Sequence, residues 1–249
     1  MSGHSKWANI KHRKAAQDAK RGAAFQRLLR AIIIAAKEGG GDPAMNMRLK
    51  TAIERAKAVS VPSDNIDRAI KRGTGEIEGA VYEEVVYEVY GPGGVALIVE
   101  ATTDNKNRTT PEIRALLTRN GGTLGEGGSV AWNFERRGLI TVEGGVDPDE
   151  LLLSVAEAGG DDVEEDGESF TVTTAPAELD GVLEALKKAG YVVVDSEVRF
   201  VAKTPVDINA KDMAGKILKL VDALEEHDDV QSVACNADIP DDILEALAD

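Results

Sequence analysis

The chain has 249 residues, a formal net charge of −15 at pH 7 and 43% hydrophobic residues. Such a length allows two or three domains, and no apolar run approaches the roughly 20 residues that span a bilayer. We therefore expect a protein without a membrane partner. Because Cys235 is the only cysteine, we also expect no internal disulfide and a cytoplasmic location.

The charge is divided unequally along the sequence. Residues 1–72 contain 16 Lys and Arg against 6 Asp and Glu, a net charge of +10, and residues 73–249 have a net charge of −25. Such an asymmetry indicates a polyanionic partner for the basic part. Two alternatives remain open, because the basic part could dock on the acidic body of its own chain or form a solvated helical surface.

The basic third has the apolar periodicity of helices. The first helix is expected from about residue 18 until the glycines at 39–41 end it. A second helix is expected with Asp42 as N-cap and Pro43 at its first position, and a third with Ser63 as N-cap. The first twenty residues contain few large apolar side chains, and they are expected to form an arm that orders on a partner.

After residue 73 the pattern becomes α+β. Residues 81–90 and 94–103 read as two strands of a hairpin, since glycines and a proline lie between them. A short helix is expected next, with Thr110 as N-cap and Pro111 at its first position. Residues 128–135 read as a further strand.

The following stretch has the order β-α-β-β-α-β, which is ferredoxin-like. A helix, 209–226, and a strand, 230–235, then supply what the earlier strands lack for a second sandwich. We thus predict an α+β fold with an N-terminal helical domain and two ferredoxin-like domains, one inserted in the other. The predicted boundaries are 1–75 for the basic helical domain, 76–136 with 204–249 for the host domain, and 137–203 for the insertion.

Catalytic patterns are weak throughout the sequence. The three histidines are widely separated and no paired Cys or His spacing suits a metal. The glycine-rich stretch 121–129 lacks the Lys-Ser/Thr ending of a phosphate-binding loop and precedes a strand, so turns explain it better. We expect no catalytic residues, no metal site and no cofactor.

Two segments are candidates for nucleic-acid binding. In the first 27 residues, cations that would neutralise phosphates surround a tryptophan; the candidates are Lys6, Trp7, Lys11, His12, Arg13, Lys14, Lys20, Arg21 and Arg27. Trp7 could stack on an unpaired base or anchor the arm on the helices. The second segment precedes a helix N-terminus, which favours an anion; its candidates are Asn105, Lys106, Asn107 and Arg108. A capped loop explains the second segment equally well.

Four motifs in order resemble the YebC/PmpR family of regulatory proteins. They are "MSGHSKWANIKHRKAAQDAKRG", "VPSDNIDRAIKRGTGE", "YEVYGPGGVALIVEATTDNKNRT" and "GGTLGEGGSVAWNFERRG". The resemblance runs along essentially the whole chain. It implies a helical domain with two α+β domains, and a cytoplasmic, non-enzymatic protein described as a transcriptional regulator that binds DNA. Mitochondrial relatives are described as translational activators, so the resemblance leaves DNA and ribosomal RNA open.

Two classes of function follow from the sequence. The first is a nucleic-acid-binding regulator of gene expression, acting on DNA or, as the alternative, on ribosomal RNA as a translation factor. Nothing in the sequence indicates a recognition helix for the major groove. The second class is a protein-interaction adaptor, in which the acidic α+β domains bind other proteins and the basic arm clamps onto its own chain.

Overall fold

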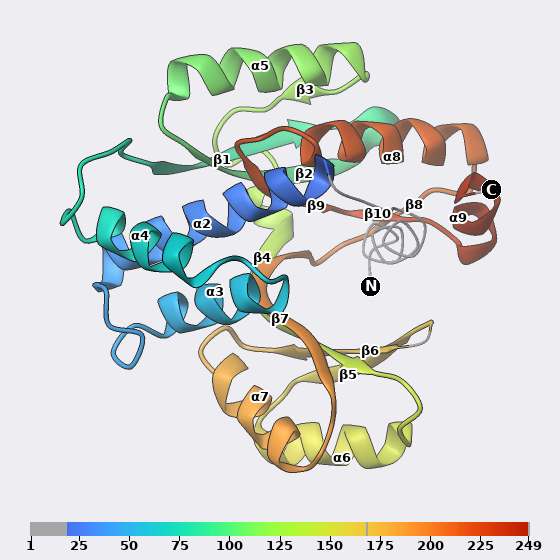
Figure 1. Ribbon diagram of the computed structural model, residues 1–249. Helices are drawn as coiled ribbons and strands as arrows, with labels where there is room; N and C mark the ends of the chain where they lie inside the picture. Colours follow the sequence, from blue (N-terminus) through green and yellow to red (C-terminus); the bar gives the residue numbers. More distant parts are fainter. Residues whose placement is uncertain (1–18, 168, 249) are drawn as a thin grey trace.

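The computed structural model describes residues 19–167 and 169–248, with side chains for 24–165, 167 and 169–247. The protein is α+β, and Figure 1 shows three parts: a group of helices, an upper sheet beneath two helices, and a lower sheet above two helices. This architecture confirms the predicted fold class. None of the described helices is both long enough and apolar enough to cross a membrane.

Three helices form the basic N-terminal part. They are α2 (Ala19–Gly39), α3 (Met47–Ala58) and α4 (Ser63–Gly73). Their apolar faces form one core, with Ile32 and Leu49 fully buried. Gly73 permits a close crossing of α4 on α2, because a Cβ there would lie 2.4 Å from the carbonyl oxygen of Ile33. The core therefore depends on burial between helices rather than on any single helix.

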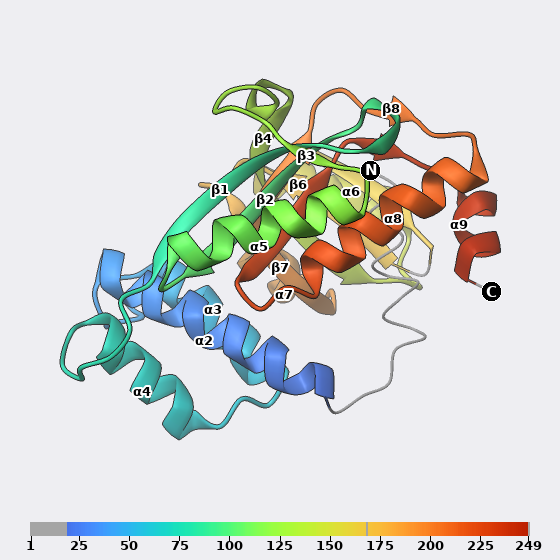
Figure 2. The ribbon, with the colours of Figure 1, turned by 90° about the horizontal axis from the view of Figure 1, so that it is seen from above.

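The upper sheet is antiparallel, with the strand order β3-β1-β2-β9. Its elements are β1 (Glu83–Tyr90), β2 (Ala96–Thr103), β3 (Thr123–Leu124), β9 (Val230–Cys235), α5 (Lys106–Arg119) and α8 (Lys211–Glu225). A 3-10 turn, η1 (Pro92–Gly94), joins β1 to β2 and confirms the predicted hairpin. Helices α5 and α8 cover one face of this sheet (Figure 2), where Leu97, Ile113 and Leu220 are fully buried.

The lower sheet is also antiparallel, with the order β5-β6-β4-β7. Its elements are β4 (Phe134–Glu143), β5 (Asp162–Asp166), β6 (Ser169–Thr174), β7 (Val193–Ala202), α6 (Pro148–Ala158) and α7 (Leu179–Lys188). Alternate residues of β4 and β6 face the two helices, and Ile140, Val172 and Leu186 are fully buried there. The β-α-β-β-α-β order is the one that the sequence predicts.

The chain enters and leaves the lower sheet through neighbouring strands. Phe134 at the start of β4 pairs with Ala202 at the end of β7. Phe134 also packs against Ile98 on the face of the upper sheet that α5 and α8 leave uncovered. Short strands β8 (Val206–Asp207) and β10 (Ala237–Asp238), and helix α9 (Asp241–Ala248), complete the fold. The limits 137 and 203 of the insertion remain a prediction.

Two helix starts differ from the prediction. Helix α3 begins at Met47 with Asn46 as N-cap, whereas residues 43–45 form a turn that the Asp42 carboxylate closes. Asn46 also donates to the carbonyl oxygens of Ala35, at 2.7 Å, and Gly40, at 2.8 Å, so a contact with α2 fixes the cap. Ser63 is the first residue of α4 and makes no side-chain cap.

Two further predictions after residue 100 are wrong. Helix α5 begins at Lys106 with Asn105 as N-cap, so Thr110 is not a cap and Pro111 lies inside the helix. Residues 128–133 are not a strand, because they contain the 3-10 turn η2 (Ala131–Asn133) and β4 starts only at Phe134. Backbone N–H groups of this segment bind the Glu88 carboxylate instead of a neighbouring strand.

Candidate nucleic-acid interface

Most of the predicted arm lies outside the described residues, namely Lys6, Trp7, Lys11, His12, Arg13 and Lys14. Lys20 and Arg21 belong to the first turn of α2, but the structure describes side chains only from residue 24 onward in this helix. Their assignment to nucleic acid therefore stays a prediction.

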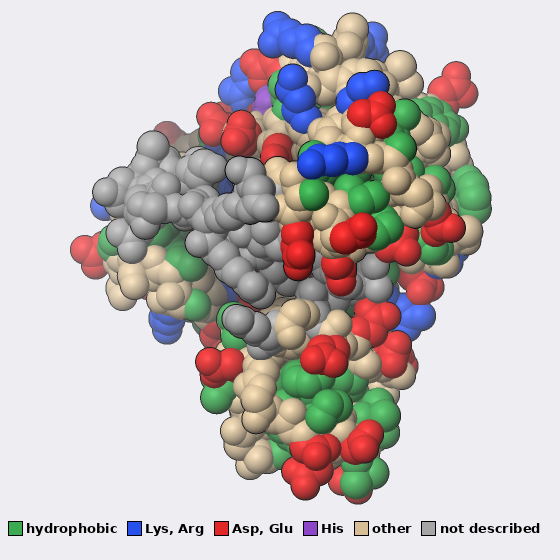
Figure 3. All heavy atoms as spheres, turned by 90° about the vertical axis from the view of Figure 1, so that its right-hand side faces the viewer, with side chains coloured by type: hydrophobic (Ala, Val, Ile, Leu, Met, Phe, Trp, Pro, Cys, Tyr) green, Lys and Arg blue, Asp and Glu red, His purple; other side chains and the backbone are tan. Residues whose placement is uncertain are grey.

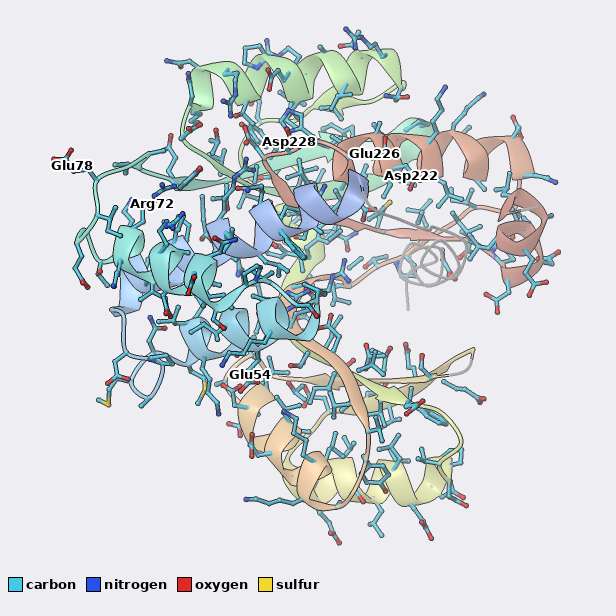
Figure 4. The ribbon with its side chains drawn as sticks, in the orientation of Figure 1. Glu54, Arg72, Glu78, Asp222, Glu226 and Asp228 are labelled. Carbon is cyan, nitrogen blue, oxygen red and sulfur yellow. The ribbon has the colours of Figure 1, made fainter. Side chains whose placement is uncertain are left out.

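Arg27 contacts the acidic body of the chain. Its guanidinium donates to the carbonyl oxygen of Glu225 at the end of α8, and that of Arg30, one helical turn later, donates to the carbonyl oxygen of Asp228. Burial lowers the pKa of Arg27, against the opposing charges of Glu225 and Asp228. Figure 4 shows Asp222, Glu226 and Asp228 gathered around this end of α8, beside the first turns of α2. These contacts agree with the alternative in which the basic part docks on the acidic body of its own chain.

Asp229 lies at the centre of this contact. Only 3% of its side chain is exposed, and its carboxylate forms ion pairs with Arg30 of α2 at 3.2 Å and with Arg108 of α5 at 2.6 Å. Thr109 donates a further hydrogen bond of 2.6 Å. One buried carboxylate thus connects the helical part, α5 and the segment between α8 and β9. We call Arg30, Arg108, Thr109 and Asp229 the Asp229 junction.

The junction favours the ionised form of its carboxylate. Burial alone would raise the pKa of Asp229, but the hydrogen bonds from Thr109 and Arg108 and the charges of Arg108 and Arg30 bring it below its ordinary value. Its backbone is also held, because Thr102 N–H donates to the Asp229 carbonyl at 2.7 Å. The loop expected to attract an anion therefore binds an anion of its own chain.

The four candidates of this loop divide by their contacts. Asn105 caps α5 by accepting from the backbone N–H of Arg108 at 3.2 Å, as the capped-loop alternative proposes. Arg108 is directed at Asp229, with Asp104 and Glu112 also within 4 Å. Lys106 and Asn107 are exposed in the first turn of α5. The role of these four residues toward nucleic acid stays a prediction.

The helical part presents further cations to solvent. Arg48 pairs with Glu38 and Glu84, and Arg55 pairs with Asp195 and Glu197 of β7. Among the side chains that the structure describes, three exposed cations of α3 and α4 have no ion pair or hydrogen bond: Lys57, Arg68 and Lys71. They are available to a phosphate backbone.

A second group of cations lies on α5 and α8. Seven of the 13 Lys and Arg residues in the acidic part, 73–249, belong to these two helices. Within the described part of the chain, exposed Arg114, Arg119 and Lys219 have no ion pair or side-chain hydrogen bond. In Figure 3 the blue side chains gather at the top of the molecule, where α5 and α8 lie, and red side chains predominate below. We call Arg114, Arg119 and Lys219 the α5–α8 cations.

Sequence reasoning singled out Arg108 but missed the other residues of the Asp229 junction, and it missed the α5–α8 cations. Asp229 is one of 44 acidic residues, and its arginine partners lie 121 or more positions away. No local pattern could single it out. The α5–α8 cations did carry a signal, since Arg114, Arg119 and Lys219 lie within two predicted helices of a region, 73–249, that has only 13 Lys and Arg.

Evidence for metal or thiol chemistry is lacking in the described residues. Within 19–167 and 169–248, no group of three or more His, Cys, Asp or Glu could hold a metal ion. Cys235 is buried in β9, and burial raises the pKa of its thiol to about 12. A thiol in this state is protonated at neutral pH and is a poor nucleophile.

The fold and surface thus define a three-part α+β protein with a basic helical domain docked on an acidic body. Residues 5–76 match the TACO1/YebC N-terminal domain, and residues 82–237 match the TACO1/YebC second and third domain. The chain belongs to the TACO1/YebC family, as the four sequence motifs predict.

Its relatives match over their full length. A "Probable transcriptional regulatory protein" of Moorella thermoacetica is 54% identical, with 99% of each chain covered. One of the same description from Dictyoglomus turgidum is also 54% identical, with 100% of each chain covered. The crystal structure of a conserved hypothetical protein from Aquifex aeolicus is 48% identical, with a TM-score of 0.85 over 90% of this chain and 93% of that chain.

Proposed function

We propose that the protein is a non-enzymatic regulator of gene expression that acts in the cytoplasm by binding nucleic acid, with DNA as the leading partner. The name of its relatives, transcriptional regulatory protein, supports this role. Ribosomal RNA, and with it a role in translation, is the alternative within the same class.

The separation of charge carries the proposal. A chain with a net charge of −15 places a net charge of +10 in its first 72 residues. The unpaired cations of α3 and α4 extend that basic surface into the described structure, and the α5–α8 cations add a second one. Basic surfaces of this kind bind the phosphate backbone and position a protein, without reading base sequence.

The acidic body restricts how nucleic acid can approach. Its charge of −25 over residues 73–249 repels a polyanion everywhere except at the basic surfaces. Docking of Arg27 and Arg30 on the end of α8 fixes where the basic arm leaves the body. The repulsion and the docking together favour one orientation of bound nucleic acid.

The adaptor alternative is favoured by one observation. Arg27, a predicted phosphate contact, donates to a carbonyl oxygen of its own chain and lies beside acidic residues of α8. If the rest of the arm behaves in the same way, the basic segment neutralises the body and the acidic domains bind proteins.

Salt-dependent binding distinguishes the two functions. The full chain and a variant lacking residues 2–20 are titrated with labelled duplex DNA and with structured RNA at several salt concentrations. We expect the logarithm of the binding constant of the full chain to fall linearly with the logarithm of salt concentration. The truncated variant should bind far more weakly while its sheets stay folded, because the arm contributes little to any core.

The outcomes separate the candidates. Tighter binding to duplex DNA than to RNA at equal salt supports the leading assignment, and the reverse supports the RNA alternative. Binding that is absent, or that is insensitive to salt and to truncation, contradicts the nucleic-acid function and leaves the adaptor.

A further inference from the structure

Two aromatic side chains are exposed side by side at one end of the upper sheet. Trp132 of η2 is 67% exposed and Tyr90 at the end of β1 is 46% exposed. Large apolar side chains gathered at the surface of a folded protein often mark an interaction site. Tyr90 belongs to the third of the four family motifs and Trp132 to the fourth. The basic surfaces described above do not account for either residue.

A shared acceptor holds the two rings together. The Trp132 indole N–H donates to the carbonyl oxygen of Ser129 at 3.0 Å, and the Tyr90 hydroxyl donates to the same oxygen at 3.4 Å. The polar atom of each ring is thus directed at the protein. The ring faces remain the part available to a partner.

The backbone beneath the rings is held from two sides. The Glu88 carboxylate accepts from the N–H groups of Gly128, Val130 and Ala131, the last two at 2.7 and 2.8 Å. These bonds lower the pKa of Glu88, against the opposing effect of burial. On the other side, Asn133 exchanges two hydrogen bonds with Thr204, at 2.9 and 3.0 Å.

Two glycines of this segment help to place the backbone close to the rings. A Cβ at Gly125 would lie 3.3 Å from the Tyr90 ring and 2.3 Å from the Ser129 hydroxyl, so only glycine fits there without a shift. Gly128 has φ +85, a conformation that glycine adopts readily. The glycine-rich stretch therefore builds a rigid support for the rings. Figure 2 shows this segment, between β3 and β4, projecting from the body.

We propose that Trp132 and Tyr90 form a stacking site for an unpaired base of the bound nucleic acid. The inference rests on the proposed function. Aromatic rings stack on bases of any sequence, because every base has a π-face, and rings already fixed by hydrogen bonds lose little conformational entropy on binding.

A cation is available to a nucleotide phosphate beside the rings, although the segment also carries exposed Glu126; the Glu88 carboxylate beneath the rings is bound by three backbone N–H groups. Lys203 is exposed, and its backbone N–H donates to the carbonyl oxygen of Asn133, the neighbour of Trp132, at 2.8 Å. A strand of nucleic acid whose phosphate binds Lys203 would pass beside the segment that carries Trp132.

Tryptophan fluorescence tests the site directly, since the chain has only two tryptophans, Trp7 and Trp132. In a Trp7→Phe protein, emission comes from Trp132 alone. We expect quenching on addition of oligo(dT) or oligo(U), and much less quenching with blunt duplex DNA. Comparing the two oligomers at equal salt distinguishes DNA from RNA as the source of the base.

Affinity for the same oligomers tests the energetic role. Trp132→Ala should weaken binding by about 5- to 150-fold without changing the salt slope, because stacking releases few counterions. Trp132→Phe, which keeps an aromatic face, should retain most of the affinity. Leu153→Ala is the matched control, since Leu153 is 62% exposed and belongs to α6, a helix that covers the lower sheet.

The failures of the two proposals are distinct. If the wild-type chain binds with salt dependence but Trp132→Ala behaves like Leu153→Ala, the stacking site is wrong and the proposed function stands. If Trp132→Phe, folded by its thermal melt, loses as much affinity as Trp132→Ala, the aromatic face is not the cause and the proposal is also wrong. If the wild-type chain binds no nucleic acid, both proposals fail.

Discussion

The two sheets of this protein share an architecture and differ in surface charge. Each has four antiparallel strands with two helices on one face. The helices of the upper sheet, α5 and α8, carry seven Lys and Arg against four Asp and Glu. Those of the lower sheet, α6 and α7, carry two against five.

This difference shows that the residues that stabilise the fold are not the residues that determine binding. Both helix pairs bury the same kinds of apolar side chain against their sheets, so the core requires neither charge pattern. The charges lie on the outer helix faces, where substitution costs little stability. A binding function therefore cannot be assigned from the fold, and must be argued from the surface.

The largest expected effect tests whether the two sheets fold as separate units. Leu220 of α8 and Leu186 of α7 are both 0% exposed, and replacement of either by Ala should cost about 2–5 kcal/mol. If the predicted insertion 137–203 is a domain of its own, Leu186→Ala should reduce amide protection in the lower sheet only. Hydrogen exchange measures this, and equal loss in both sheets would contradict the predicted boundaries.

The sequence predicts the cores of both sheets well because their patterns are local. The hairpin of β1 and β2, helix α6 and strand β9 follow from alternation and helical periodicity within single segments. That β9 joins the upper sheet also follows, since a lone strand needs a sheet, whereas its pairing with β2 is seen only in the structure.

The remaining differences arise where a distant residue decides the local structure. Residues 128–133 have the composition of a strand, but their N–H groups bind Glu88, about forty positions earlier. Asn46 caps α3 and also binds Ala35 of α2. The Asp229 junction is the same case at the candidate site, because its four residues come from three separate segments.

The junction itself provides the second prediction. Asp229→Asn removes the negative charge that pairs with both Arg30 and Arg108. It should lower the free energy of unfolding by about 2 kcal/mol, which is less than for a fully buried ion pair because Arg108 is partly solvated. Asp104→Asn is the control: Asp104 is partly exposed and lies 3.4 Å from Arg108, so its loss should cost under about 0.5 kcal/mol. Urea unfolding measures both, and equal costs would mean that the junction does not hold the helical part.

The same variant has a defined pH dependence. The pKa of Asp229 lies below its ordinary value of 3.8 in the folded protein. Its carboxylate therefore adds stability at pH values above 3.8, and this contribution is lost as the pH falls through the lowered pKa. We expect Asp229→Asn to flatten the acid limb of the stability curve below about pH 4. An unchanged acid limb would show that the carboxylate is not preferentially ionised by folding.

The third prediction compares the helix surfaces directly. Neutralising Arg114, Arg119 and Lys219 by Gln should weaken binding to duplex DNA and make the salt slope shallower by about two to three units. The control is Lys187→Gln with Lys188→Gln, two exposed lysines at the end of α7. The control should leave the slope nearly unchanged. Equal effects from both variants would mean that total charge, rather than the α5–α8 cations, governs binding.

The smallest effect concerns the N-caps of α5, which covers the upper sheet, and of α6, which covers the lower sheet. Asn105 accepts from one backbone N–H of α5, and Asp147 accepts from two of α6, at 2.9 and 3.1 Å. Replacing either by Ala should cost about 1 kcal/mol. If Asn105 also contacts nucleic acid, as the sequence predicts, Asn105→Ala should lower affinity whereas Asp147→Ala should not. Asn105→Asp keeps the cap acceptor and adds a negative charge, so it should retain stability while it weakens binding further. Affinities that are equal in all three variants would remove Asn105 from the interface and leave it as a cap alone.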